Sequence, residues 1–394
     1  MLYTPERHDP LADRQFTDAK ARAAMARIVA RAEREREGRL WPRDPDDRLG
    51  DERAAASLYW GAAGIAWALG ELGVRGLERE EVEALAVRLR SDRSDPDFGE
   101  DGVWFGEAGA LAVAEHWWPD AARRERLFEL AAASLESPAL EPMIGHPGFM
   151  LLAAQLHART AEQRWANLWV DGAKRLLDQW RWDEEVGAWL WTQQLGRFQT
   201  RYLGAAHGLV GNLHVLRRGG ALLPAAEQAQ VERRGIETLS RLAVVDALHA
   251  NWPPDARDPL EVKGRIRVQW CHGATGVVIA MWDAAPEDEQ WSDLLLRAGA
   301  LVWDAGPLRD AAGICHGTAG SAYALLALWR RSGDDRWLER ARALALHAAT
   351  QTDARAKRLG HGWHSLYTGD EGVALCLAAS LSGDAGLPVA DRLI

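Results

Sequence analysis

Residues 313–328 read GICHGTAGSAYALLAL, and this stretch decides the fold. Gly317 and Gly320 stand three positions apart and open a run of mostly apolar residues. Glycines at a helix start allow a tight turn and a close approach between backbones. A helix that is apolar on most sides is buried all round. The stretch therefore predicts a buried inner helix that begins at a glycine turn.

The same G-x-x-G pattern, followed each time by an apolar run, occurs seven times at intervals of roughly 40 to 65 residues. Such a period is typical of repeat architectures, in which each repeat buries its apolar face against its neighbours. The seven pairs are Gly61 and Gly64, Gly106 and Gly109, Gly145 and Gly148, Gly208 and Gly211, Gly273 and Gly276, Gly317 and Gly320, and Gly369 and Gly372.

Amphipathic, charge-rich segments lie between these runs, for example AKARAAMARIVARAERERE (19–37) and DRWLERARALALHAAT (335–350). Their apolar residues recur at helical spacing opposite Arg and Glu, as in a solvent-facing outer helix. We therefore predict an all-α fold, a double-layered α/α toroid of seven helical hairpins, with residues 1–394 as a single domain. The Pro-rich stretch 251–265 predicts a long loop before the fifth inner helix. A protein-binding α-solenoid would share this repeat.

The composition of the 394-residue chain narrows the class of protein further. Hydrophobic residues make up 47% of it, and its formal net charge of −10 argues against non-specific nucleic-acid binding, which needs a basic surface. No apolar run approaches the roughly 20 residues of a membrane helix, and the charged N-terminus lacks the apolar part of a signal peptide. Three Cys fit a reducing compartment better than a disulfide framework. We expect a cytoplasmic protein that binds neither nucleic acid nor membrane.

Chemically reactive residues stand directly before the glycines of the fourth, fifth and sixth repeats. His207, His272 and His316 each precede a first glycine, and Cys271 and Cys315 precede the last two of them. Equivalent repeat positions lie at the same end of a toroid, so we expect these side chains to gather at one mouth. Thiolates and imidazole are the ligands that zinc prefers, and three protein ligands leave one position open, as in catalytic sites. We therefore predict one Zn²⁺ per chain, bound by Cys271, Cys315 and His316.

Alternatives stay open for several of these residues. His272 is a candidate fourth ligand, and a pair of buried core thiols is the alternative to a metal site. Cys376, inside the apolar run VALCLAA, is interpreted as such a core thiol. His207 is either a proton donor or acceptor beside the metal or a histidine packed in the core.

Three further residues, in two segments, carry candidate functional side chains. Glu141, four residues before the third glycine motif, is either a carboxylate partner at the site or a solvated loop acid. His361 and His364 in GHGWH form a second small cluster, for which we predict no metal site.

With these residues identified, the chain resembles the lanthionine synthetase C family along nearly its whole length. The seven G-x-x-G motifs carry the resemblance, together with VQWCHGATGV (268–277) and GICHGTAGSAYALL (313–326). The resemblance implies a double α-helical barrel with zinc held by two Cys and one His, here Cys271, Cys315 and His316. It also implies the role of acid–base histidine for His207 in AAHGLVG and that of its acidic partner for Glu141.

The family has two branches that differ in the thiol they use. Peptide cyclases add a Cys thiol of a precursor peptide to dehydroalanine or dehydrobutyrine in the same peptide. Stand-alone members resemble glutathione transferases, which add glutathione to dehydroamino acids in damaged proteins. The segment from NWPP to VQWCHGATGV (251–277) is similar to the stand-alone branch. We therefore predict a zinc-dependent enzyme that joins glutathione to a dehydroamino acid of a peptide or protein through a thioether. A lanthipeptide cyclase and a non-catalytic, zinc-containing peptide-binding protein are the alternatives.

Glutathione needs cationic partners, because unpaired carboxylates are costly to desolvate. Arg265, Arg267 and Arg309 lie in the segments that lead to the two zinc cysteines, and we predict that they bind the thiol substrate. In eukaryotic relatives a basic residue shortly before the second Cys helps to hold glutathione, whereas this chain has Asp310 nearest that place. This departure leaves the identity of the thiol open.

Overall fold

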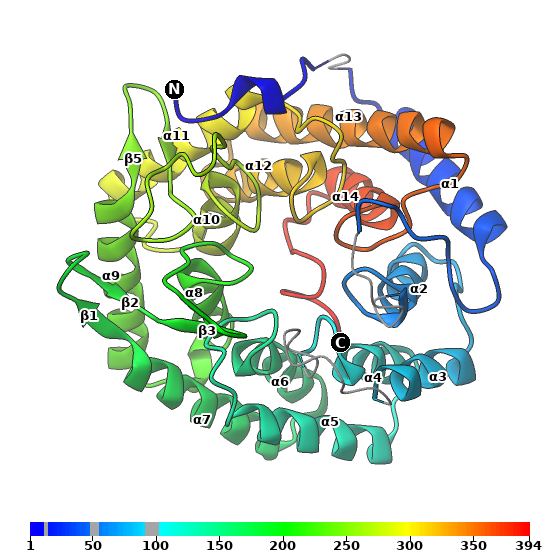
Figure 1. Cartoon of the computed structure of the whole chain (residues 1–394), viewed down its shortest axis with the longest axis horizontal. Coiled ribbons are helices and arrows are strands. Elements are labelled where there is room, and N and C mark those ends of the chain that lie inside the picture. Colours follow the sequence, from blue (N-terminus) through cyan, green and yellow to red (C-terminus); the bar gives the residue numbers. More distant parts are fainter. Residues whose placement is uncertain (12–14, 48–54, 91–101) are drawn as a thin grey trace.

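A computed structural model describes residues 1–11, 15–47, 55–90 and 102–394. Within these ranges the chain is mostly helical, as predicted, and fourteen α-helices alternate between an outer and an inner layer around a common axis (Figure 1). The inner helices are α2 (Ala62–Glu71), α4 (Glu107–Trp117), α6 (His146–Thr160), α8 (Leu209–Arg218), α10 (Ala274–Met281), α12 (Thr318–Ser332) and α14 (Asp370–Ser382). The outer helices are α1 (Asp18–Glu35), α3 (Arg79–Arg90), α5 (Ala121–Ser134), α7 (Gln163–Gln179), α9 (Ala225–Leu242), α11 (Glu289–Ala305) and α13 (Asp335–Leu359).

Every inner helix begins directly after the first glycine of a G-x-x-G pair. The second glycine packs against the turn in front of the helix. A Cβ atom at Gly320 would lie 2.1 Å from the carbonyl oxygen of Ile314, and one at Gly276 would lie 2.2 Å from that of Trp270. No side chain fits at such distances, so the repeat needs glycine there.

Backbone hydrogen bonds join equivalent positions of neighbouring repeats at the start of the inner helices. In four of the seven repeats, the residue two places before the first glycine donates its N–H to its counterpart in the next repeat. Cys271 donates to Cys315 (3.1 Å), Cys315 to Tyr367 (2.9 Å), Tyr367 to Tyr59 (3.2 Å) and Tyr59 to Trp104 (2.9 Å). The bond from Tyr367 to Tyr59 links the seventh repeat to the first, so these bonds run across the point where the ring closes.

The C-terminal residues pack inside the helical layers, near the axis (Figure 1). Trp67 on α2 donates its indole N–H to the carbonyl of Leu393 (3.2 Å), and Gln155 on α6 accepts from the Leu393 N–H (2.6 Å). The Tyr367 hydroxyl donates to the carbonyl of Pro388 (2.6 Å). The segment therefore fills part of the space that the inner helices enclose.

Short antiparallel hairpins occupy two of the connections. They pair β1 (Arg181–Asp183) with β2 (Ala188–Leu190), β3 (Gln193–Leu195) with β4 (Phe198–Thr200), and β5 (Val244–Val245) with β6 (Ala250–Asn251). The connection from β6 to α10 contains no helix, in line with the loop predicted over 251–265. Among the helices of the described ranges, none combines the length and the apolar character that crossing a bilayer requires.

Candidate metal centre

The three predicted ligands converge at the start of the inner helices. The ligand atoms of Cys271, Cys315 and His316 all lie within 4.8 Å of one another. Within the described ranges, this is the one group of three or more His, Cys, Asp or Glu residues with such a spacing. Two thiols and an imidazole within reach of a single ion are a ligand set typical of zinc. The residues present therefore fit a metal site of the predicted kind.

His272 is not part of this ligand group. Gly273 has a φ of 100°, in the region that favours glycine, and it turns the chain sharply after the Cys–His pair. The His272 ring makes an edge contact with Tyr202, with 5.3 Å between ring centroids. Cys271 and Cys315 are instead held side by side by the backbone bond between their repeats.

The surroundings favour a negative charge on one of the two thiols and a positive charge on the imidazole. A hydrogen bond from Cys315 holds the pKa of the Cys271 thiol well below its ordinary value against burial, and His316 adds to the effect. Burial raises the pKa of the Cys315 thiol. Burial also lowers the pKa of His316, but its hydrogen bond to Cys271 outweighs this and the net pKa is raised. Cys271 is therefore the more acidic of the two thiols.

Three side chains around the ligands were not among the residues predicted from the sequence. Gln269 donates its amide N–H to Cys271 Sγ (2.9 Å), and the Tyr59 hydroxyl hydrogen-bonds to Cys315. Burial raises the pKa of Asp47 to about 6, and the charge of this carboxylate acts on His316. Tyr59 occupies in the first repeat the position that Cys271 and Cys315 occupy in the fifth and sixth, so superimposing the repeats would have found it.

His207 and Glu141 lie together, as predicted. Glu141 is fully buried, and its carboxylate accepts hydrogen bonds from His207 Nδ1 (2.9 Å) and from the backbone N–H groups of Met143 and Ile144 (2.8 Å each). The solvated loop acid considered as the alternative is therefore wrong. The His207 side chain keeps 33% of its surface exposed. Burial lowers the pKa of His207, but Glu141 and Cys271 outweigh it and the net pKa is raised.

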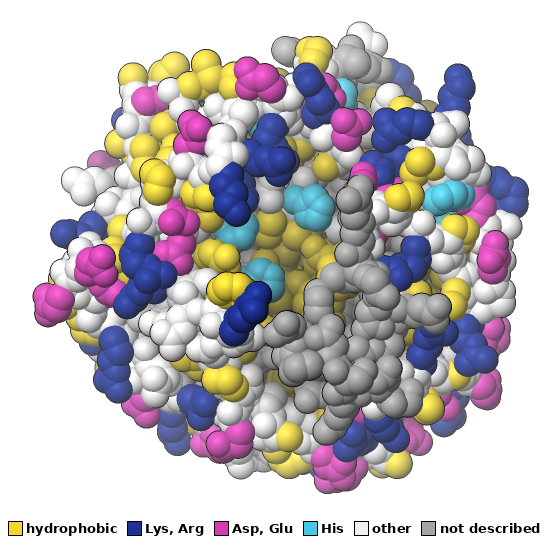
Figure 2. All heavy atoms as spheres, in the orientation of Figure 1, with side chains coloured by type: hydrophobic (Ala, Val, Ile, Leu, Met, Phe, Trp, Pro, Cys, Tyr) yellow, Lys and Arg dark blue, Asp and Glu magenta, His cyan; other side chains and the backbone are white. Residues whose placement is uncertain are grey.

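A group of arginines lies near the candidate ligands, and it includes Arg7, which the sequence did not single out. Besides burial, the charges of Arg265 and Arg267 lower the pKa of Arg7, which in turn acts on His316. Arg267 also acts on His272. Within the part of the chain that the structure describes, no carboxylate pairs with these three arginines. Figure 2 shows basic and histidine side chains beside a hollow with a largely hydrophobic floor.

Arg309 differs from these three because it has internal partners. Its guanidinium donates to Asp9 (2.8 Å) and to the carbonyl of His8 (3.2 Å), and its backbone N–H donates to Arg7 (2.8 Å). Asp310 pairs with Arg358 (3.5 Å). Arg309 thus fastens the N-terminal segment that carries Arg7, and its predicted contact with a thiol substrate stays a prediction.

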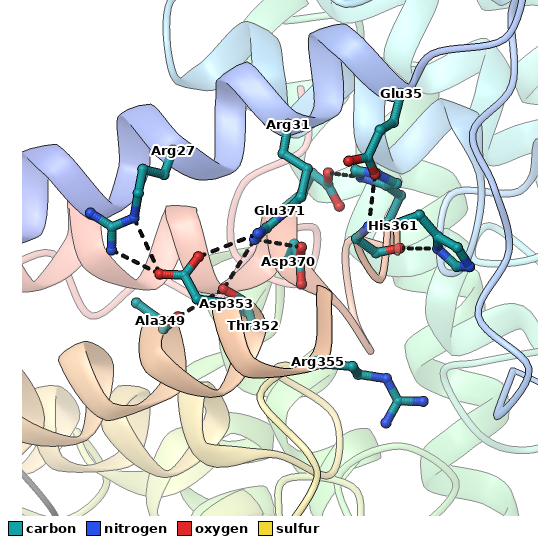
Figure 3. A network of polar contacts seen from close by, with 12 residues as sticks. Arg27, Arg31, Glu35, Ala349, Thr352, Asp353, Arg355, His361, Asp370 and Glu371 are labelled. Atoms are coloured by element: carbon teal, nitrogen blue, oxygen red, sulfur yellow. Dashed lines mark hydrogen bonds and ion pairs between the residues drawn. The ribbon is translucent and has the colours of Figure 1, made fainter. Parts of the chain in front are cut away.

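The second histidine cluster belongs to a partly buried ionic network that includes none of the candidate metal ligands. His364 lies between Glu371 (2.8 Å) and Glu35 (2.9 Å), and His361 bonds to the carbonyl of Gly362. Figure 3 shows Arg27 and Arg31 of α1 turned toward acidic side chains of α13 and α14, whereas Glu35 is turned toward the segment between these two helices. The cluster joins the N-terminal helix to the last two helices. Cys376, which is not part of the candidate ligand group, is fully buried, as expected of a core thiol.

The arrangement defines a helical barrel with a Cys₂His centre at the ends of its inner helices, and comparisons with known proteins agree with it. Residues 51–389 match the family described as lanthionine synthetase C-like protein. The chain therefore belongs to the LanC-like family.

Individual relatives are more distant. A glutathione S-transferase, LANCL1 of Danio rerio, is 32% identical over 146 residues, which cover 36% of this chain and 34% of that protein. The LanC-like protein GCL1 of Arabidopsis thaliana is 33% identical over 151 residues, covering 37% of this chain and 32% of that one. The matched part thus spans about a third of the length of these relatives. The solved structure of nisin cyclase is similar in fold, with a TM-score of 0.64 at 14% identity over 91% of this chain and 93% of that one.

Proposed function

We propose that the protein is a zinc enzyme that adds glutathione to dehydroalanine or dehydrobutyrine residues of peptides or proteins. The observation that carries the proposal is the convergence of Cys271, Cys315 and His316 beside the pair formed by His207 and Glu141. Three protein ligands leave a zinc ion one position for a substrate. When bound there, zinc lowers the pKa of a substrate thiol so that the thiolate is available at neutral pH.

In the proposed reaction, a bond forms between the thiolate sulfur and the β-carbon of the dehydroamino acid. The electron pair of the double bond moves to the α-carbon, which must gain a proton. His207 is suited to give it, because Glu141 accepts from Nδ1 and leaves Nε2 to carry the proton toward the substrate. The sum is addition of S–H across the double bond, with no leaving group and no redox change. His207 then regains its proton from solvent.

A group of arginines is suited to bind the carboxylates of the thiol substrate. Arg265 and Arg267 lie close enough to Arg7 to lower its pKa, and no acidic side chain of the described ranges forms an ion pair with any of the three. Three like charges held together without a counter-ion favour an anionic ligand. Arg guanidinium binds carboxylate in two places, which suits the two carboxylates of glutathione.

Competition between thiols tests this assignment. The purified protein is given a dehydroalanine peptide with equal concentrations of glutathione and an uncharged thiol of similar pKa, and the products are counted by mass spectrometry. Glutathione is expected to dominate in the wild type, and Arg7→Ser and Arg267→Ser are expected to reduce its advantage. Arg257→Ser, which removes an arginine paired with Asp255, is the matched control. Equal use of both thiols, together with ring closure on a dehydropeptide that contains its own Cys, would favour a cyclase instead.

A further inference from the structure

Each candidate thiolate ligand accepts a hydrogen bond from an uncharged side chain. Gln269 Nε2 lies 2.9 Å from Cys271 Sγ, and the Tyr59 hydroxyl hydrogen-bonds to Cys315 Sγ. Both donors are buried, with 8% of Gln269 and 5% of Tyr59 exposed. Because a thiolate only accepts hydrogen bonds, the amide must present its N–H₂ group to the sulfur.

The surroundings of Cys315 make such a donor necessary. Cys315 is 5% exposed, and its backbone N–H donates to Tyr367, whose ring stacks on that of Tyr59. A buried anion without a hydrogen bond is costly, and a ligating thiolate is such an anion. Tyr59 therefore supplies the hydrogen bond that water would supply to an exposed thiolate.

The backbone bonds between neighbouring repeats hold Tyr59 in place. Tyr59 donates its N–H to Trp104 and accepts from the N–H of Tyr367, whose carbonyl accepts from Cys315. The Tyr59 ring stacks on that of Tyr367, with 5.1 Å between centroids and 18° between planes. Tyr59 and Cys315 thus stand in a fixed relation across the closure of the barrel.

We infer that Tyr59 and Gln269 are positioning residues that hold the two ligand sulfurs and withdraw electron density from them. A sulfur that accepts a hydrogen bond gives less charge to the metal, which keeps more of its attraction for the substrate thiol in the fourth position. The inference rests on the proposed function, since it concerns the same metal site.

Two isosteric or nearly isosteric changes, Tyr59→Phe and Gln269→Met, remove the donors one at a time. Tyr367→Phe is the matched control, because it removes a buried hydroxyl from the same aromatic cluster, one that donates to Pro388. The zinc dissociation constant is measured against a chromophoric chelator. The thiolate-to-metal charge-transfer band is then recorded on the protein loaded with Co²⁺, as a readout independent of turnover.

We expect Tyr59→Phe and Gln269→Met each to weaken zinc binding by roughly 10- to 100-fold. Each is also expected to move the charge-transfer band to longer wavelength, because a more electron-rich sulfur gives up its electron more easily. Tyr367→Phe should leave both readouts unchanged. The inference, but not the proposed function, would be overturned if the two test variants kept the zinc affinity and band position of the wild type. It would also be overturned if Tyr367→Phe lost as much zinc affinity as they do. A wild-type protein that binds neither metal would overturn the proposed function as well.

Discussion

Replacing Glu141 by Gln keeps the size of a fully buried side chain but removes its charge. In the wild type, the carboxylate accepts three hydrogen bonds, from Met143, Ile144 and His207. The amide of Gln has one acceptor oxygen and an N–H₂ group, so at least one of these donors loses its acceptor. A buried donor left unpaired costs about 1–3 kcal/mol, so Glu141→Gln is expected to lower the free energy of unfolding by that amount without unfolding the protein.

The same change acts on the chemistry through His207. Glu141 is the main group that raises the pKa of His207 against burial. A general acid works below its pKa, so the wild-type rate should fall as pH rises through that raised value. In Glu141→Gln the fall should begin at a lower pH. General acid catalysis contributes roughly 10²–10⁴-fold, and we expect Glu141→Gln and His207→Asn each to slow the addition within that range while retaining zinc.

The double variant separates a shared role from two independent ones. If Glu141 acts through His207, Glu141→Gln with His207→Asn should be no slower than His207→Asn alone. The rate is followed as thioether formation on a dehydroalanine peptide by mass spectrometry. Glu115→Gln, which alters another buried carboxylate, one that pairs with Arg124, is the control for general destabilisation. Multiplied losses in the double variant, or wild-type turnover in His207→Asn, would refute the reasoning.

Three further changes test the ligands, the repeat and the ionic network. Cys271→Ala and Cys315→Ala should each abolish most zinc binding in elemental analysis, and undiminished zinc in both would remove them as ligands. Gly320→Ala places a methyl group against the Ile314 carbonyl and should destabilise the fold by about 1–3 kcal/mol in thermal unfolding, so an unchanged Tm would contradict the packing described. Burial lowers the pKa of His364, but Glu371 and Glu35 raise it to about 9, above the ordinary value of about 6.5. Its contribution, about 3 kcal/mol, is full below pH ~6.5 and lost as pH rises through 9, so the stability gap between wild type and His364→Gln should narrow over that range.

The sequence predicted the features of the fold that depend on local sterics. The second glycine of each pair is needed because a carbonyl lies where its Cβ would be, and such a constraint repeats visibly along the chain. Cys271, Cys315 and His316 could be predicted as ligands because they stand at equivalent positions of two successive repeats.

The residues that the sequence did not reveal reach the site by tertiary contacts. Arg7 lies near Arg265 because the Ile266 N–H donates to Thr4 Oγ1 (2.8 Å) and Arg309 donates to the Arg7 carbonyl, and no local pattern reports either bond. The pairing of Arg309 with Asp9 was hidden in the same way. Glu141 stands before a turn, and its carboxylate accepts hydrogen bonds from the N–H groups of that turn. The composition of the loop does not indicate that Glu141 is buried.

The most direct measurement incubates the purified, zinc-loaded protein with a dehydroalanine peptide and glutathione and determines the mass of the peptide. We predict a glutathione adduct that forms only in the presence of the protein, no longer forms when a chelator removes the metal and is absent with Cys315→Ala. A peptide whose mass stays unchanged with the zinc-loaded wild type, or an adduct that forms equally fast with Cys315→Ala, would contradict it.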